Sequence, residues 1–216
     1  SHELRTPLTA ITGWSETILS NEKLDSETRR GMKIIHREAQ RLTEMVLELL
    51  DFTRIQDDRM TLNMEMVDIR AEFEDTVFMY GSRLEADGIH LEYMDNDDDI
   101  PEITCDPQRM RQVFLNILDN AAKHGGEGKQ IEASMHFDGD QVRVCIRDHG
   151  PGIPENEIAH VKERFFKGST HTRGNGIGLA VCEEIVTRHG GELLIANAEG
   201  GGLIVTVKLP AGDSQF

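Results

Sequence analysis

A heptad seam in the first quarter of the chain constrains the fold more than any other feature of the sequence. Its apolar residues step alternately by four and three positions, and they are Ile35, Ala39, Leu42, Val46 and Leu49. That spacing aligns them along one side of a helix, as in the a and d positions of a helical bundle. Residues 1–20 carry a second helical pattern, and a polar connection at residues 21–26 follows it. The two segments therefore predict an antiparallel helical hairpin.

A single hairpin of this size cannot bury both of its apolar seams. We therefore predict that residues 1–57 of two chains pair as a four-helix bundle, which makes the protein a homodimer through its hairpin. The alternative is a hairpin that packs within its own chain against the domain that follows. Pro7 lies inside the first helix and predicts a kink or weakened backbone hydrogen bonds there.

The periodicity changes after the polar segment at residues 56–59, where we place the domain boundary. From residue 60 to 212, short alternating segments predict strands and longer periodic segments predict helices. The predicted strands cover residues 62–66, 89–93, 103–105, 131–137, 142–146, 193–195 and 203–207. The predicted helices cover residues 69–86, a segment that begins at Asp106-Pro107, and residues 177–189. Helices with a mostly antiparallel sheet predict an α+β layered sandwich.

The charge and cysteine content exclude some classes of partner. The formal net charge is -16, whereas phosphate backbones and anionic membranes bind basic surfaces, so we predict no nucleic-acid partner. The three cysteines are widely spaced and odd in number, which indicates reduced thiols in the cytoplasm. No apolar run approaches the ~20 residues of a membrane span. Because the sequence opens inside a helical pattern, we expect a fragment whose membrane contact is made only through segments missing from it.

A histidine stands beside the first apolar stripe. Leu4, Leu8 and Ile11 fall at helical spacing, and His2 lies off that stripe, where it can face water and a partner. An imidazole is a suitable phosphoryl acceptor because one ring nitrogen is free and neutral near pH 7. Glu3 is the candidate to hydrogen-bond the other nitrogen. Taken alone, a histidine at such a position is more often an ordinary exposed histidine.

A polar stripe lies along the predicted helix that begins at Asp106-Pro107. Asn116, Asn120 and Lys123 fall at positions i, i+4 and i+7, so they share one face of that helix. An amide oxygen suits a magnesium ion that keeps most of its waters, and an amide NH2 can donate to a phosphate oxygen. Two asparagines on a helix are otherwise common surface residues.

A glycine-rich turn follows the strand predicted to end at Ile146, with the sequence Asp148-His149-Gly150-Pro151-Gly152-Ile153. A buried aspartate can accept a hydrogen bond from the exocyclic amine of adenine, which guanine lacks at that position, and this would select the base. Gly150 and Gly152 let a flat base approach the backbone. The alternative is a glycine-proline turn capped by aspartate.

A third cluster, with Gly174, Gly176 and Gly178 followed by Leu179, opens the last predicted helix. Glycines at a helix N-terminus expose backbone N–H groups to a phosphate. The spacing matches neither the dinucleotide fingerprint nor the Walker loop. Residues 162–173 precede this cluster and include Phe165, Lys167 and Arg173, which suit a mobile cover over phosphates. The alternative for that segment is a loop without a ligand role.

In their order and spacing these segments resemble the catalytic core of the sensor histidine kinases of bacterial two-component systems, over nearly the whole chain. Residues 1–8 resemble the H box, residues 116–123 the N box, residues 148–152 the first glycine box, residues 165–166 the F box and residues 174–179 the second glycine box. The resemblance implies a dimeric helical hairpin, residues 1–57, followed by a Bergerat-type α/β sandwich that binds ATP, residues 60–212. It also implies a location on the cytoplasmic side of a membrane-anchored sensor.

The resemblance further implies a role for each residue. His2 receives the γ-phosphoryl group of ATP and passes it to an aspartate on the receiver domain of a response regulator. Glu3 orients or deprotonates His2, and Thr6 supports a phosphatase activity on that regulator. Asn116 holds Mg²⁺, and Asp148 reads adenine. The implied nucleotide-binding set is Asn116, Asn120, Lys123, Asp148, Gly150, Gly152, Ile153, Phe165, Lys167, Arg173, Gly174, Gly176, Gly178 and Leu179.

Two other functions remain open at this point. One is an ATPase clamp of the same nucleotide-binding fold, although such clamps lack an H box on a preceding hairpin. The other is a signalling scaffold without turnover. Lys162 departs from the family pattern because an aromatic residue is usual there, and Asp119 adds a negative charge beside the polar stripe.

Overall fold

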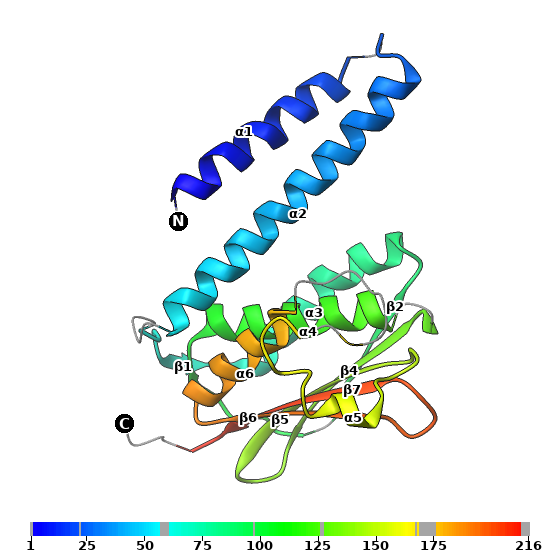
Figure 1. The fold of residues 1–216 in the computed structure, drawn as a ribbon. Helices are drawn as coiled ribbons and strands as arrows, with labels where there is room; N and C mark the ends of the chain where they lie inside the picture. The colour runs from blue at the N-terminus through cyan, green and yellow to red at the C-terminus, as the bar shows by residue number, and fades with distance from the viewer. Residues whose placement is uncertain are drawn as a thin grey trace. The chain divides into compact units, whose positions relative to one another are not determined.

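The computed structural model describes residues 2–21, 23–56, 61–96, 98–125, 128–166, 168 and 176–212. The chain divides into two compact units, residues 1–60 and residues 61–216. Figure 1 shows the first as a pair of long helices in blue and the second as helices packed on a sheet, from cyan to red.

The first unit is a helical hairpin of α1 (His2–Leu19) and α2 (Ser26–Gln56), as the sequence predicts. Asp25 caps α2, because its carboxylate accepts hydrogen bonds from the backbone N–H groups of Glu27 and Thr28 at 3.0 and 2.8 Å. Within the single hairpin, Ala39 of the predicted seam is buried, whereas Ile35 and Leu42 are 45% and 50% exposed. The seam is therefore not covered by the hairpin alone.

Among its described residues, the second unit contains two sheets. In the smaller one, β1 (Glu65–Val67) pairs with β3 (Ile103–Cys105) in antiparallel orientation. The larger sheet has the strand order β2-β4-β5-β7-β6. Its strands are β2 (His90–Met94), β4 (Gln130–Phe137), β5 (Gln141–Asp148), β6 (Glu192–Asn197) and β7 (Leu203–Pro210). Only β2 and β4 run parallel within this sheet, so the predicted mostly antiparallel arrangement is confirmed.

Three long helices pack on one face of the larger sheet (Figure 1): α3 (Ile69–Ala86), α4 (Pro107–His124) and α6 (Gly178–Arg188). A fourth helix, α5 (Glu155–Ile158), is short. Alternate residues of β4, β5 and β7 are buried, as Ile131, Ala133 and Met135 are on β4. The rings of Phe73 and Phe114 meet edge to face, with centroids 4.9 Å apart. This is the α+β sandwich that the sequence predicts.

Asp106 starts α4 as the sequence indicates, with Pro107 in the first turn and the Asp106 carboxylate accepting from Arg109 N at 3.1 Å. That cap fixes the start of the helix that carries the polar stripe.

Among the helices of the described residues, none combines the length and the apolar character needed to cross a membrane.

Candidate functional site

The polar stripe of α4 is confirmed as a partly exposed face of a helix whose other face is buried. Asn116 and Asn120 are half-buried and Lys123 is exposed, whereas Val113 and Ile117 are fully buried. The buried positions come from the same 3.6-residue period that brings the three polar residues together.

Asn116 contacts α6 through a hydrogen bond to Cys182. Burial raises the pKa of the Cys182 thiol to about 12, so the sulfur keeps its proton, which it donates to the Val113 carbonyl at 3.7 Å. The bond with Asn116 lowers that pKa, against the effect of burial.

Lys123 forms an ion pair with Asp119, one turn earlier on α4. Asp119 also accepts a hydrogen bond from the Tyr80 hydroxyl of α3 at 3.0 Å. Burial, assisted by the Asp119 charge, raises the pKa of Tyr80 far above its ordinary value, so the phenol stays a donor. Asp119 thus holds the lysine side chain against the helix that carries the two asparagines.

Asp148 is the last residue of β5 and is 5% exposed. Its Oδ1 accepts hydrogen bonds from Gly150 N at 2.9 Å and Leu203 N at 3.2 Å. Burial raises the pKa of this carboxyl, and the two backbone bonds oppose the shift. Within the described part of the chain, both of these bonds fall on Oδ1, so Oδ2 is the oxygen that a ligand would use.

The end of α4 and the turn after Asp148 touch each other. A Cβ added to Gly150 would lie 2.7 Å from Gly125 Cα and 2.8 Å from the His124 carbonyl oxygen. Glycine is therefore needed at both position 125 and position 150 for the end of α4 to lie this close to the turn. The fold thus brings the C-terminal end of the polar stripe to Asp148, although some 25 residues separate them in the sequence.

Two residues of the β6–β7 turn also contact this region, and the sequence analysis did not single them out. Gly202 packs so closely that an added Cβ would collide with the Asp148 carbonyl oxygen. Asn197, at the end of β6, hydrogen-bonds the backbone of Ile153. A polar residue that ends an apolar strand just before a glycine-rich turn was the available signal for Asn197.

The aromatic pair and the second glycine cluster meet in the structure. Phe165 N donates to Gly176 O at 2.8 Å, and both residues have positive φ, 61° and 68°. The Phe165 side chain is 59% exposed, whereas the Phe166 ring stacks on His160 with centroids 6.0 Å apart. Gly178 and Leu179 open α6 directly afterwards and are half-buried.

Lys162, which stands where the family pattern has an aromatic residue, has a defined place. Its Nζ donates to the Leu193 carbonyl of β6 at 2.6 Å and lies 3.0 Å from Glu183 Oε2 of α6. These contacts attach the segment before Phe165 to both elements, as packing of an apolar ring would do.

Lys167, Arg173 and Gly174 lie outside the described residues, and so do the side chains of His2 and Glu3. The backbone of His2 begins α1, and Thr6 is exposed one turn later on the same helix.

Comparison with known proteins identifies the family. Residues 105–213 match the family described as histidine kinase-, DNA gyrase B- and HSP90-like ATPase. Residues 1–58 match the His kinase A (phospho-acceptor) domain. The chain belongs to the sensor histidine kinases. The order of the two matches corresponds to the catalytic core of such kinases, and the resemblance noted in the sequence is confirmed.

Curated relatives of this kinase core are longer proteins. The non-motile and phage-resistance protein of Caulobacter vibrioides is 33% identical over 227 residues, which cover 100% of this chain and 27% of that protein. The signal transduction histidine-protein kinase AfsQ2 of Streptomyces coelicolor is 31% identical over 234 residues, covering 99% of this chain and 41% of that protein. The chain therefore spans less than half the length of these relatives.

Among solved structures, full-length ShkA in complex with AMPPNP resembles the kinase core with a TM-score of 0.80 and 28% sequence identity. The match covers 97% of this chain and 44% of that chain. The Acinetobacter baumannii histidine kinase AdeS shares the α+β fold with a helical N-terminal unit, with a TM-score of 0.66 and 24% identity over 99% of both chains.

Proposed function

We propose that this kinase core phosphorylates itself on His2 with ATP and then transfers the phosphoryl group to an aspartate of a response regulator in two-component signal transduction. One observation carries the proposal: a buried carboxylate, Asp148, is held by backbone bonds in a unit that follows a phospho-acceptor domain. The AMPPNP complex of ShkA, a structure of the same fold, supports ATP as the nucleotide.

Asp148 suits adenine recognition. Its Oδ1 is engaged by Gly150 N and Leu203 N, and Oδ2 would accept a hydrogen bond from the exocyclic amine of adenine. Guanine presents a carbonyl oxygen at that position, so it would face the carboxylate as a second acceptor. Gly150, Gly152 and Ile153 would lie along the base.

The polar stripe of α4 suits a triphosphate with Mg²⁺. In the part of the chain that the structure describes, no group of three or more His, Cys, Asp or Glu side chains could hold a metal. A magnesium ion would therefore keep waters and phosphate oxygens as most of its ligands, which is its common mode beside nucleotides. Asn116 would hold the ion through its amide oxygen, and the bound ion would neutralise phosphate charge.

The remaining phosphate contacts would come from charged side chains and from a helix N-terminus. Asn120 and Lys123 would donate to phosphate oxygens, and Lys123 would exchange its Asp119 partner for them. Phe165, Gly176, Gly178 and Leu179 lie at or near the start of α6, where backbone N–H groups favour an anion. We also assign Lys167, Arg173 and Gly174 to this group, on the family pattern.

The transfer itself needs a nucleophile in line with the γ-phosphate. An imidazole nitrogen of His2 forms the new N–P bond, the bond from the γ-phosphorus to the bridging oxygen breaks, and ADP leaves. Glu3 accepts or orients the proton on the ring. The phosphoryl group then passes to a carboxylate of the receiver domain. Residues 1–57 would serve phosphotransfer and dimerisation, and residues 60–212 ATP binding.

A homodimer follows from the apolar surface of the hairpin. Ile35 and Leu42 of α2 remain about half exposed, and Trp14 of α1 is 70% exposed. Pairing with a second hairpin would cover these side chains in a four-helix bundle. We also propose, on the family pattern, that the kinase core works on the cytoplasmic side of a membrane-anchored protein.

A phosphatase activity is a second proposal. Thr6 is exposed on α1 one helical turn after His2, so both side chains can share one helix face. A hydroxyl there would orient water towards the phospho-aspartate of the bound regulator.

Incubation with γ-labelled ATP and Mg²⁺ tests the kinase function. We expect label that survives base and is lost in acid, that disappears in His2→Ala, and that persists in His90→Ala, an exposed histidine of β2. An ATPase clamp would release phosphate without labelling itself, and a scaffold would do neither. Label that persists in His2→Ala would contradict the site assignment.

A further inference from the structure

One side chain of the β6–β7 turn (residues 197–203) holds both backbone groups of a residue in the glycine loop (residues 148–153). Asn197 Oδ1 accepts a hydrogen bond from Ile153 N at 2.9 Å. Asn197 Nδ2 donates to Ile153 O at 2.7 Å. A primary amide that binds an N–H and a C=O of the same residue fixes both the position and the orientation of that peptide segment.

The residue before Ile153 is shaped by the same amide. Gly152 has φ +72°, and an added Cβ would lie 2.6 Å from Asn197 Oδ1. A larger residue would therefore displace the amide and strain the backbone. The sequence predicts that Gly152 lets a base approach the backbone, and the close contact with Asn197 is a second reason for a glycine at this position.

The turn holds the other end of the glycine loop as well. Leu203 N donates to Asp148 Oδ1 at 3.2 Å, and the turn closes through a bond from Ala198 N to Gly202 O at 2.9 Å. Asp148 and Ile153 are thus both attached to one short hairpin turn. The two glycines between them would otherwise give the loop many conformations.

We propose that Asn197 is a positioning residue for the nucleotide: it sets the glycine loop relative to Asp148 and so contributes to the choice of adenine over guanine. This inference rests on the proposed function, in which Asp148 reads the base. Asn197 acts through Ile153 and Gly152. Without its amide, the loop would have to be ordered at the moment of binding, which weakens affinity.

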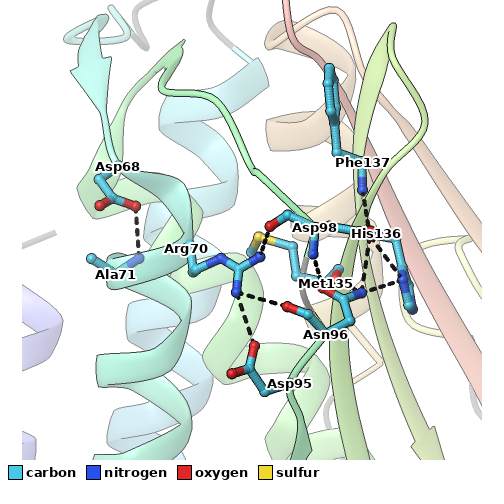
Figure 2. Close-up of polar contacts among 9 residues, drawn as sticks. All are labelled: Asp68, Arg70, Ala71, Asp95, Asn96, Asp98, Met135, His136 and Phe137. Carbon is cyan, nitrogen blue, oxygen red and sulfur yellow. Dashed lines mark hydrogen bonds and ion pairs between the residues drawn. The ribbon is translucent and has the colours of Figure 1, made fainter.

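The chain offers a matched control at the other end of the same sheet. Figure 2 shows Asn96, whose Nδ2 donates to Met135 O at 2.7 Å and whose Oδ1 accepts from Asp98 N at 3.3 Å. Asn96 therefore also ties a loop to backbone groups. It lies beside the end of β4, whereas Asp148 pairs with Ile131 near the start of that strand. The two positions are about 15 Å apart along the strand.

The experiment compares Asn197→Ala with Asn96→Ala by calorimetric binding of AMPPNP and its guanine counterpart, with thermal unfolding of each variant. We expect Asn197→Ala to weaken AMPPNP binding about three- to tenfold, the loss of one or two exposed hydrogen bonds, and to reduce the adenine preference. Asn96→Ala should lower the unfolding temperature about as much as Asn197→Ala does, and it should leave the affinities for both nucleotides unchanged. Asn197→Asp should behave like Asn197→Ala, because a carboxylate oxygen would face the Ile153 carbonyl.

The outcomes separate this inference from the proposed function. If the unaltered protein binds AMPPNP and Asn197→Ala binds it equally well, the positioning role is wrong and the kinase proposal stands. An equal loss of affinity in Asn96→Ala would also overturn the positioning role, since it would indicate general loosening of the domain. If the unaltered protein binds no adenine nucleotide, both proposals fail.

Discussion

Replacement of Asp148 with asparagine separates what this side chain does for a ligand from what it does for the fold. Both of its backbone hydrogen bonds, from Gly150 N and Leu203 N, fall on Oδ1. An asparagine can keep both on its carbonyl oxygen. What it loses is the acceptor at Oδ2, where an NH2 group would face the amine of adenine. A hydrogen bond to a charged group contributes about 1.5–3 kcal/mol, so the Kd for AMPPNP should rise about 10- to 150-fold.

Asp148→Asn should lose affinity for the nucleotide without losing stability. Burial raises the pKa of Asp148, so its ionised form near pH 7 disfavours the folded state relative to the unfolded chain. The neutral amide removes that penalty. We therefore expect Asp148→Asn to unfold at the same temperature as the unaltered protein or at a higher one.

Asp106 provides the matched control, because it is also a buried aspartate that accepts two backbone N–H groups. Its bonds are divided: Oδ1 accepts from Arg109 N and Oδ2 from Asn63 N, at 3.1 and 2.9 Å. An asparagine can keep only one of them, so Asp106→Asn should lower the free energy of unfolding by about 1–3 kcal/mol and leave the Kd unchanged.

Calorimetric titration with AMPPNP and differential scanning calorimetry measure the two effects. The reasoning would be refuted if Asp148→Asn bound AMPPNP as tightly as the unaltered protein. It would also be refuted if binding were lost together with stability to the extent seen in Asp106→Asn, because the glycine loop would then have collapsed.

Three further predictions concern pH, packing and the regulator. His189 is buried and neutral, and its Nε2 accepts a hydrogen bond from Asp106 N at 3.0 Å. Burial lowers the pKa of His189, so as the pH falls the unfolded chain binds a proton before the folded protein does. The free energy of unfolding should therefore fall as the pH drops through about 6.5, and urea titrations at several pH values would detect or disprove this. Gly202→Ala should cost several times more stability in thermal unfolding than Gly200→Ala, because both have φ +87° but only Gly202 meets the Asp148 backbone; equal costs would argue against that contact. Thr6→Ala should slow dephosphorylation of the regulator and leave self-labelling intact, and an unchanged rate in a phosphate-release assay would remove Thr6 from that role.

Periodicity was sufficient for the long elements. The heptad seam and the Asp106-Pro107 start predicted helices that the structure contains, because spacing and capping act locally. The strand predicted at residues 62–66 is instead Glu65–Val67, since its partner β3 is only three residues long. The four-residue α5 was not predicted, because one turn of helix carries no apolar period.

The candidate residues of the nucleotide site also divide into those that a local sequence pattern indicates and those that depend on distant contacts. Asp148 and its glycines form a local motif, and the sequence was enough to select them. Asn197 contacts Ile153 across 44 residues, and no spacing rule connects the two. The place of Lys162 was likewise invisible, because its partner Leu193 offers a backbone carbonyl that any residue would supply.

The central claim is that a nucleotide held at Asp148 is the phosphoryl donor to His2. Mass spectrometry of peptides from the protein after incubation with ATP and Mg²⁺, kept at alkaline pH, tests this most directly. At an ATP concentration below the Kd of the unaltered protein, we predict one phosphoryl group, on His2, and a lower fraction of phosphorylated His2 in Asp148→Asn under the same conditions. Phosphorylation at another residue, or of His2 to the same extent in that variant, would contradict it.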